Sequence, residues 1–268
     1  MIPLSSVKVS SSLLLLAAVS LGSAARADEV LEVKIGAAHF PPYTVRPEPE
    51  QGADTGLLPQ LVEALNRLQS RHRFVLVPTS IPRRFGDFQQ GRTDMAIFEN
   101  PQWGWQEIAH NTVDMGLEDA EIFVSRQQAG RDQHYFDDLE GKRLALFNGY
   151  HYAFADFNPD PAWLKKRYRA TLTYSHDSNL NMVERGRADI ALVTRSYLSD
   201  FLKRNPDSSS QLLASQRVDQ VYHHYALLRP GASISPEAFA SLLRQLRENG
   251  ELLRIFRPYQ ITVEAPHD

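Results

Sequence analysis

The chain has 268 residues, 43% of them hydrophobic, so it can bury a substantial core and is neither a disordered chain nor a small disulfide-stabilised domain. Its 29 Lys and Arg and 32 Asp and Glu residues give a net charge of −3, which lacks the bulk positive charge typical of nucleic-acid-binding proteins. The absence of cysteine excludes disulfides, thiolate catalysis and cysteine-ligated metal sites. We therefore expect no nucleic-acid partner and no disulfide-linked partner.

Residues 1–27 are typical of a cleaved secretory signal peptide. Lys8 precedes an apolar stretch from Leu13 to Gly22 that is too short to cross a bilayer, and Ala25-Arg26-Ala27 has the small residues of a cleavage site. The alternative interpretation is a buried N-terminal helix. No later segment is long and apolar enough for a membrane helix, so we expect an exported protein, periplasmic in a Gram-negative organism.

In the remaining chain, short β-rich runs alternate with helical patterns. The first set comprises a strand at 33–38, an amphipathic helix at 57–68, a strand at 74–77, a short helix carrying Phe85 and Phe88, and a strand at 94–98. Such alternation of strands and helices predicts a parallel sheet flanked by helices.

The pattern then restarts and predicts a second α/β set. Its elements are a strand at 144–147, a helix opened by Pro161, a strand at 170–174, a helix at 178–185, a strand at 190–193 and a helix at 196–204. A strand at 225–228 and an amphipathic region interrupted at Asn249-Gly250 end the pattern. Two α/β sets predict two lobes, with the ligand site in the cleft between them.

Six short motifs follow one another along the chain. They are Phe40-Pro41-Pro42-Tyr43, Thr55-Gly56-Leu57-Leu58, Gly91-Arg92-Thr93-Asp94, Asp138-Leu139-Glu140-Gly141-Lys142-Arg143, Glu184-Arg185-Gly186-Arg187-Ala188-Asp189, and the ending from Leu246 to Phe256. In this order and spacing, over residues 31–259, they resemble the family 3 extracellular solute-binding proteins, the periplasmic receptors of polar amino-acid ABC importers.

The resemblance implies an α/β fold of the two-lobed periplasmic-binding-protein type (type II), each lobe a mixed, mostly parallel sheet flanked by helices. It also implies that lobe 1 comprises residues 28–122 plus 225–268, and that lobe 2 and the hinge strands comprise residues 123–224. Members of this family are commonly monomers, and we expect a monomer here.

Two positions depart from the amino-acid-binding members of this family. The resemblance implies an Arg that binds the ligand α-carboxylate where this chain has Trp103. It also implies an Asp for the ligand α-ammonium where this chain has Thr194 followed by Arg195. Because both halves of the amino-acid clamp are replaced, we expect a ligand other than a standard α-amino acid.

Residues at the same family positions provide aromatic and acidic candidates for the cleft. The aromatic candidates are suited to stacking a ring or enclosing an organic cation, and they are Tyr43, Phe98, Trp103, Trp105 and Tyr150. Glu99 is suited to pairing with such a cation or to accepting hydrogen bonds from hydroxyls. For Trp103 and Trp105 the alternative is a place in the core of the first lobe.

Two further candidates concern a ligand anion. Asn148-Gly149, before Tyr150, corresponds to a family turn whose N–H groups bind an anion at a helix start, although a simple tight turn explains it equally well. Arg83 or Arg84 could supply the missing positive charge, or could form an exposed helix start. The predicted ligand-binding residues are therefore Tyr43, Arg83, Phe98, Glu99, Trp103, Asn148, Gly149, Tyr150, Thr194 and Arg195.

The sequence predicts no cofactor and no metal site. Adjacent His223 and His224 point to opposite faces of a regular strand and cannot share a metal, and phosphate-binding, dinucleotide-binding and hydrolase motifs are absent. We therefore expect a solute-binding protein without enzymatic activity, with an ABC importer as partner. The alternatives are a periplasmic sensor subunit that acts on a membrane protein, and a cyclohexadienyl-dehydratase-like enzyme with Glu99 and His151 as its acid–base pair.

Overall fold

The structure is a computed structural model that describes residues 1, 30–46 and 53–265. Residues 2–27 of the expected signal peptide therefore lie outside the described part of the chain. Within the described part, every helix is too short or too polar to cross a membrane.

The described strands form one mixed nine-stranded sheet that runs through both lobes. The order is β2-β1-β3-β8-β4-β7-β5-β6, and β9 pairs with β4. β1 is parallel to β2 and β3, β5 is parallel to β6 and β7, and the other pairings are antiparallel. The strands are β1 (Leu31–Ala38), β2 (His72–Thr79), β3 (Met95–Glu99), β4 (Asn111–Arg126), β5 (Leu144–Phe147), β6 (Thr171–Thr173), β7 (Ile190–Thr194), β8 (Leu212–Leu228) and β9 (Thr262–Val263).

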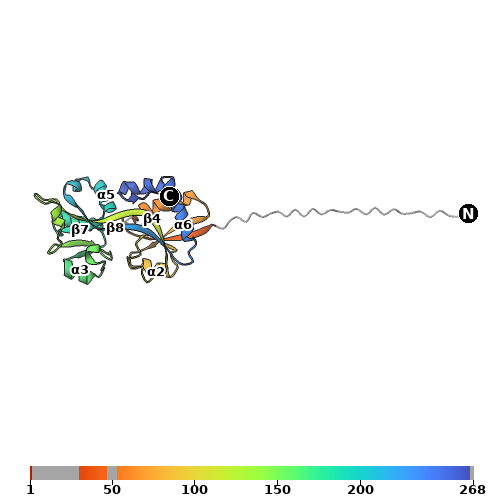
Figure 1. The fold of residues 1–268 in the computed structure, drawn as a ribbon, viewed down its shortest axis with the longest axis horizontal. Helices are drawn as coiled ribbons and strands as arrows, with labels where there is room; N and C mark the ends of the chain where they lie inside the picture. Colours follow the sequence, from red (N-terminus) through yellow and green to blue (C-terminus); the bar gives the residue numbers. More distant parts are fainter. Residues whose placement is uncertain (2–29, 47–52, 266–268) are drawn as a thin grey trace.

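The long strands β4 and β8 connect the two lobes (Figure 1). They pair with each other along their length, from Asn111 opposite Leu228 to Arg126 opposite Leu212. On the outer sides, β8 pairs with β3 and β4 pairs with β7, so the two parallel strand sets become parts of one sheet. The sequence pattern predicted only the end of β8, and the family resemblance implied short hinge strands near residues 122–125 and 222–225. The full lengths of β4 and β8 were not predicted, because acidic residues and register shifts interrupt their apolar alternation.

Helices cover the sheet as the sequence predicted. Pro161 opens α3, whose first turn is capped by the Asp160 carboxylate accepting from Trp163 N–H at 2.6 Å. Gly250, with a φ of 80°, separates the last two helices as expected. The helices are α1 (Leu57–Leu68), α2 (Arg84–Gln89), α3 (Pro161–Tyr168), α4 (His176–Glu184), α5 (Arg195–Arg204), α6 (Pro236–Glu248) and α7 (Glu251–Phe256).

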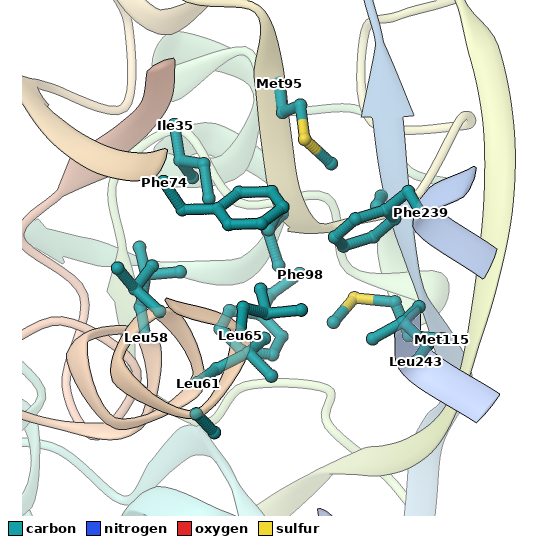
Figure 2. Packing of buried hydrophobic residues seen from close by; sticks show 14 of the residues in the cluster. Ile35, Leu58, Leu61, Leu65, Phe74, Met95, Phe98, Met115, Phe239 and Leu243 are labelled. Carbon is teal, nitrogen blue, oxygen red and sulfur yellow. The ribbon is translucent and has the colours of Figure 1, made fainter. Parts of the chain in front are cut away.

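Each lobe has its own hydrophobic core on both faces of the sheet. Figure 2 shows part of the largest cluster, in which Phe74 of β2 faces Phe239 of α6 with ring centroids 6.2 Å apart. In the second lobe, α4 and α5 pack on one face, and Leu164 of α3 packs with Phe123 on the other. Separate cores agree with a division into two lobes, while the boundaries given above stay a prediction.

Candidate functional site

A cleft lies between the lobes at the crossing of the two long strands. Its walls are formed by the chain after β1, the start of α2, the end of β3 and the turn after β5, and β4 and β8 each contribute one residue. The empty volume between these walls is about 800 Å³, including space open to solvent. Clefts between two lobes are a preferred place for small-molecule binding.

Six of the ten predicted ligand-binding residues line this cleft: Tyr43, Phe98, Glu99, Trp103, Gly149 and Tyr150. The other four do not. Arg83 is exposed, and its neighbour Arg84 lines the cleft instead. Thr194 is fully buried and caps α5 by accepting from Tyr197 N–H at 3.1 Å, while Arg195 begins that helix.

The turn after β5 does not present a free set of N–H groups to an anion. Asn148, which does not line the cleft, donates its N–H to the Thr173 carbonyl at 2.7 Å. At the short 3-10 helix that follows (Ala153–Ala155), the Asp219 carboxylate accepts from the N–H groups of Ala153 and Phe154, both at 2.8 Å. A carboxylate of the protein therefore binds the N–H groups at the start of this short helix, a few residues after the Asn148-Gly149 turn to which the sequence analysis assigned a ligand anion.

Glu99 is committed to contacts inside the protein rather than to a ligand cation. The Nε atom of Arg84 lies 2.6 Å from Glu99 Oε1, and Trp105 donates its indole N–H to Glu99 Oε2 at 2.8 Å. Trp105 is fully buried against Phe85 and Phe88, which makes it a core residue of the first lobe. The charges of Arg84 and Glu99 compensate each other at the wall of the cleft.

Glu121, on β4, is the acidic residue of the cleft that the sequence analysis missed. It is 2% exposed, and its Oε1 atom has no hydrogen-bond partner within the described ranges. Burial raises its pKa well above the usual value, and the nearby carboxylates of Asp219 and Asp119 raise the pKa further. The available signal was a single carboxylate followed by the apolar run Ile122-Phe123-Val124.

A buried polar network beside Glu121 fixes Tyr43. The Tyr43 hydroxyl donates to Asp119 Oδ2 at 2.6 Å and lies 2.7 Å from His224 Nε2. Burial lowers the pKa of His224 to about 3, so this imidazole is neutral at pH values near 7. Asp119 also accepts from Ser196 N–H at 3.3 Å, so the network joins both lobes.

We expect Tyr43→Phe to destabilise the protein by about 1–3 kcal/mol, because the buried Asp119 loses a hydrogen-bond donor. Urea denaturation of the variant and the parent measures this difference. Tyr174→Phe is the matched control, since Tyr174 is 67% exposed and should change stability by less than about 0.5 kcal/mol. Equal effects of the two substitutions would show that the network contributes no stability.

The remaining polar groups leave an acidic cleft with aromatic walls. His151 has a pKa lowered first by burial and then by Arg84, so it is neutral near pH 7. Phe40 from the first lobe meets Tyr150 from the second edge-to-face, with ring centroids 5.3 Å apart, and Trp103 lies on the same cleft. Because Arg84 and Glu99 pair with each other, Glu121 is the carboxyl group without a counter-ion among the described cleft residues.

Comparison with protein families finds no family model that matches this chain, and comparison with curated proteins finds no match. Solved structures match over most of its length. A histidine kinase sensor domain with similarity to periplasmic binding proteins has a TM-score of 0.67 and 15% identity, with 88% of this chain and 98% of that chain covered.

Two further similar structures belong to binding proteins. An ABC uptake transporter substrate binding protein from Streptococcus pneumoniae with bound histidine has a TM-score of 0.66 and 15% identity, covering 85% of this chain and 92% of that chain. A mutant of ArgBP from T. maritima has a TM-score of 0.63 and 19% identity, covering 85% and 95%. These likenesses confirm the predicted two-lobed periplasmic-binding-protein fold. Because the sequence identities are 19% or lower, the likenesses concern the fold and not the ligand.

Proposed function

We propose that this protein is a solute-binding protein of the family 3 type that closes its lobes around a small organic cation. The observation that carries this proposal is Glu121, a buried carboxyl on the crossing strand that lines the cleft and has an oxygen without a hydrogen-bond partner among the described residues. An ionised carboxylate buried without a partner is costly, and a ligand ammonium or guanidinium group supplies the partner that the protein lacks.

The walls of the cleft suit the apolar part of such a ligand. Phe40 and Tyr150 approach from opposite lobes, and Trp103 is partly buried beside them. Aromatic faces attract cations by about 0.5–2 kcal/mol each, and they stack on planar groups. Phe40 and Tyr150 are already in contact across the two lobes, so a ligand would enter as the lobes open and be enclosed by these rings as they close again.

A ligand carboxylate finds no free cation in the described part of the cleft. Arg84 is paired with Glu99, and Trp103 stands where amino-acid-binding relatives are expected to have an Arg. This supports the prediction that the ligand is an amine, a guanidine or a quaternary ammonium compound rather than a standard α-amino acid.

We expect Trp103→Ala to weaken ligand binding by about tenfold, because it removes an aromatic wall of the cleft. Arg195→Ala should leave the affinity unchanged, since Arg195 does not line the cleft. Calorimetric titration of both variants tests the difference. Equal or reversed losses would place the ligand elsewhere.

For the partner we propose an ABC importer, with a membrane sensor as the second candidate. The likeness to a histidine kinase sensor domain keeps the sensor in consideration, because closure of the lobes serves either role. Deletion of the gene should abolish uptake of the labelled ligand for an importer and leave uptake unchanged for a sensor. We propose that the protein is a monomer in the periplasm and that its signal peptide is cleaved after Ala27. The intact mass of the exported protein would test the cleavage position.

A thermal-shift screen tests the ligand class directly. The panel contains polyamines, guanidines and quaternary ammonium compounds, each with a neutral analogue of similar shape, together with α-amino acids, sugars and aromatic acids. A ligand at about 100 times its dissociation constant adds about 2.7 kcal/mol of stability, which is readily visible. A shift with cations alone supports the proposal, whereas a shift with only α-amino acids, sugars or aromatic acids would refute it.

A further inference from the structure

Three chelating side chains meet outside the cleft, where β9 joins the crossing strands. Glu118, His223 and Glu264 each place one ligand atom within 4.8 Å of the other two. We propose that these residues form a binding site for a divalent transition-metal ion, for which Zn²⁺ is the appropriate probe. This site is separate from the proposed organic-cation cleft and does not depend on it.

Strand pairing explains why these three residues share a face. Glu118 of β4 lies directly opposite His223 of β8, and opposite residues of antiparallel strands project to the same side. Glu118 is also opposite Thr262 of β9, and Glu264 follows two residues later on that same side. The hydrogen bond from Glu264 N–H to the Gly116 carbonyl, at 2.9 Å, holds this segment against β4.

The adjacent histidines face different surroundings, as the sequence analysis expected. His224 is buried beside Tyr43, whereas the His223 side chain is 43% exposed. The expectation that the pair cannot share a metal therefore agrees with the structure. The conclusion that no metal site exists did not take account of carboxylates from neighbouring strands, which the sequence places 105 and 41 positions away from His223.

The chemistry of the cluster matches a borderline transition-metal ion. One imidazole nitrogen and two carboxylate oxygens provide three ligands, and water completes a four-coordinate Zn²⁺ site. His223 Nδ1 lies 3.0 Å from Glu264 Oε1, yet it has no well-aligned hydrogen bond among the described residues. This N···O distance is short enough for both atoms to bind one metal ion. With neutral His223, the two carboxylates carry a charge of about −2, which a divalent ion neutralises.

The partly exposed ligands leave an open path for the ion. The side chain of Glu264 is 27% exposed, compared with 43% for His223, so neither requires unfolding for metal entry. A bound ion would connect β4, β8 and the segment after β9. We therefore expect metal binding to raise the unfolding temperature of the protein.

Calorimetric titration of Zn²⁺ into the full, folded protein prepared without a polyhistidine tag tests the site. We expect one ion per chain, with an affinity that falls by about tenfold or more in both His223→Ala and Glu118→Gln. The matched control is His134→Ala, which removes an 87% exposed histidine paired with the single carboxylate of Asp137. This control should bind Zn²⁺ as the parent does, and circular dichroism confirms that all variants are folded.

Two outcomes would overturn the proposal. If His223→Ala and Glu118→Gln retain the affinity of the parent, the cluster is an ordinary ion pair between His223 and Glu264. If Mg²⁺ or Ca²⁺ binds at this site more tightly than Zn²⁺, the imidazole is not a ligand, because these ions select oxygen. Either result leaves the organic-cation proposal untouched, since that proposal rests on a different set of residues.

Discussion

Glu121→Gln should reduce the affinity for the cationic ligand by at least about 30-fold. Truncating one partner of a buried, hydrogen-bonded charge pair costs about 2–5 kcal/mol, and each 1.4 kcal/mol is about tenfold in affinity. Glutamine keeps the shape and polarity of the side chain but removes the charge that the ligand requires. Calorimetric titration with the cation identified by the screen measures the loss.

The matched control for this experiment is Glu107→Gln. This variant makes the same chemical change at an exposed glutamate that does not line the cleft. We expect its affinity to equal that of the parent. A Glu121→Gln variant that binds the cation as tightly as this control would show that Glu121 is not its counter-ion.

The same substitution should stabilise the unliganded protein at alkaline pH. The folded state raises the pKa of Glu121, so this group contributes stability that is fully present below the ordinary pKa of glutamate. That stability is lost as the pH rises through the raised pKa. Glutamine does not titrate, so the stability of the variant has no such loss. Urea denaturation from about pH 4 to about pH 9 should therefore show that the free energy of unfolding of the variant, relative to that of the parent, increases as the pH rises. A constant difference across this range would contradict the assigned pKa direction.

Glu99→Ala should destabilise the protein by about 3–5 kcal/mol. The side chains of Arg84 and Glu99 are only 10% and 11% exposed, so the variant leaves a guanidinium largely buried without its counter-ion. The buried indole N–H of Trp105 loses its acceptor at the same time. Chemical denaturation with urea measures the free energy of unfolding.

An exposed ion pair provides the control for this prediction. Glu63 and Arg67 pair on the surface of α1, with side chains 69% and 51% exposed, and such pairs contribute about 0–1 kcal/mol. Glu63→Ala should therefore cost far less than Glu99→Ala. Similar losses would mean that solvent screens the Arg84–Glu99 pair and that Glu99 remains available to a ligand.

The sequence predicted the elements whose hydrophobic pattern is regular. The leucines of α1 recur at helical spacing because the helix buries one face against the sheet, and the strand at β7 is a continuous apolar run because it is buried on both sides. The full lengths of the two long strands were not predicted, because the crossing places polar groups in their interior. Asp119 and Glu121 of β4 are buried, although polar residues in an alternating strand pattern are expected to face solvent.

The aromatic cleft residues were predictable, whereas their electrostatic context was not. Tyr43 and Tyr150 follow strand ends, where ligand sites of α/β folds lie, and both line the cleft. The pairing of Arg84 with Glu99 joins a helix start to a strand end and carries no local signal. Thr194 was predicted as a ligand residue because the family resemblance implies a ligand-binding Asp at this position, the end of β7, but its hydroxyl caps α5.

A crystal structure of the protein with a cation from the screen tests the central proposal most directly. It should show closed lobes, with a ligand nitrogen within about 3 Å of a Glu121 carboxylate oxygen and the Phe40 and Tyr150 rings against the ligand. The Arg84–Glu99 pair should remain intact. A ligand whose charged group is a carboxylate bound to Arg84, with Glu121 left unpaired, would contradict the proposed function.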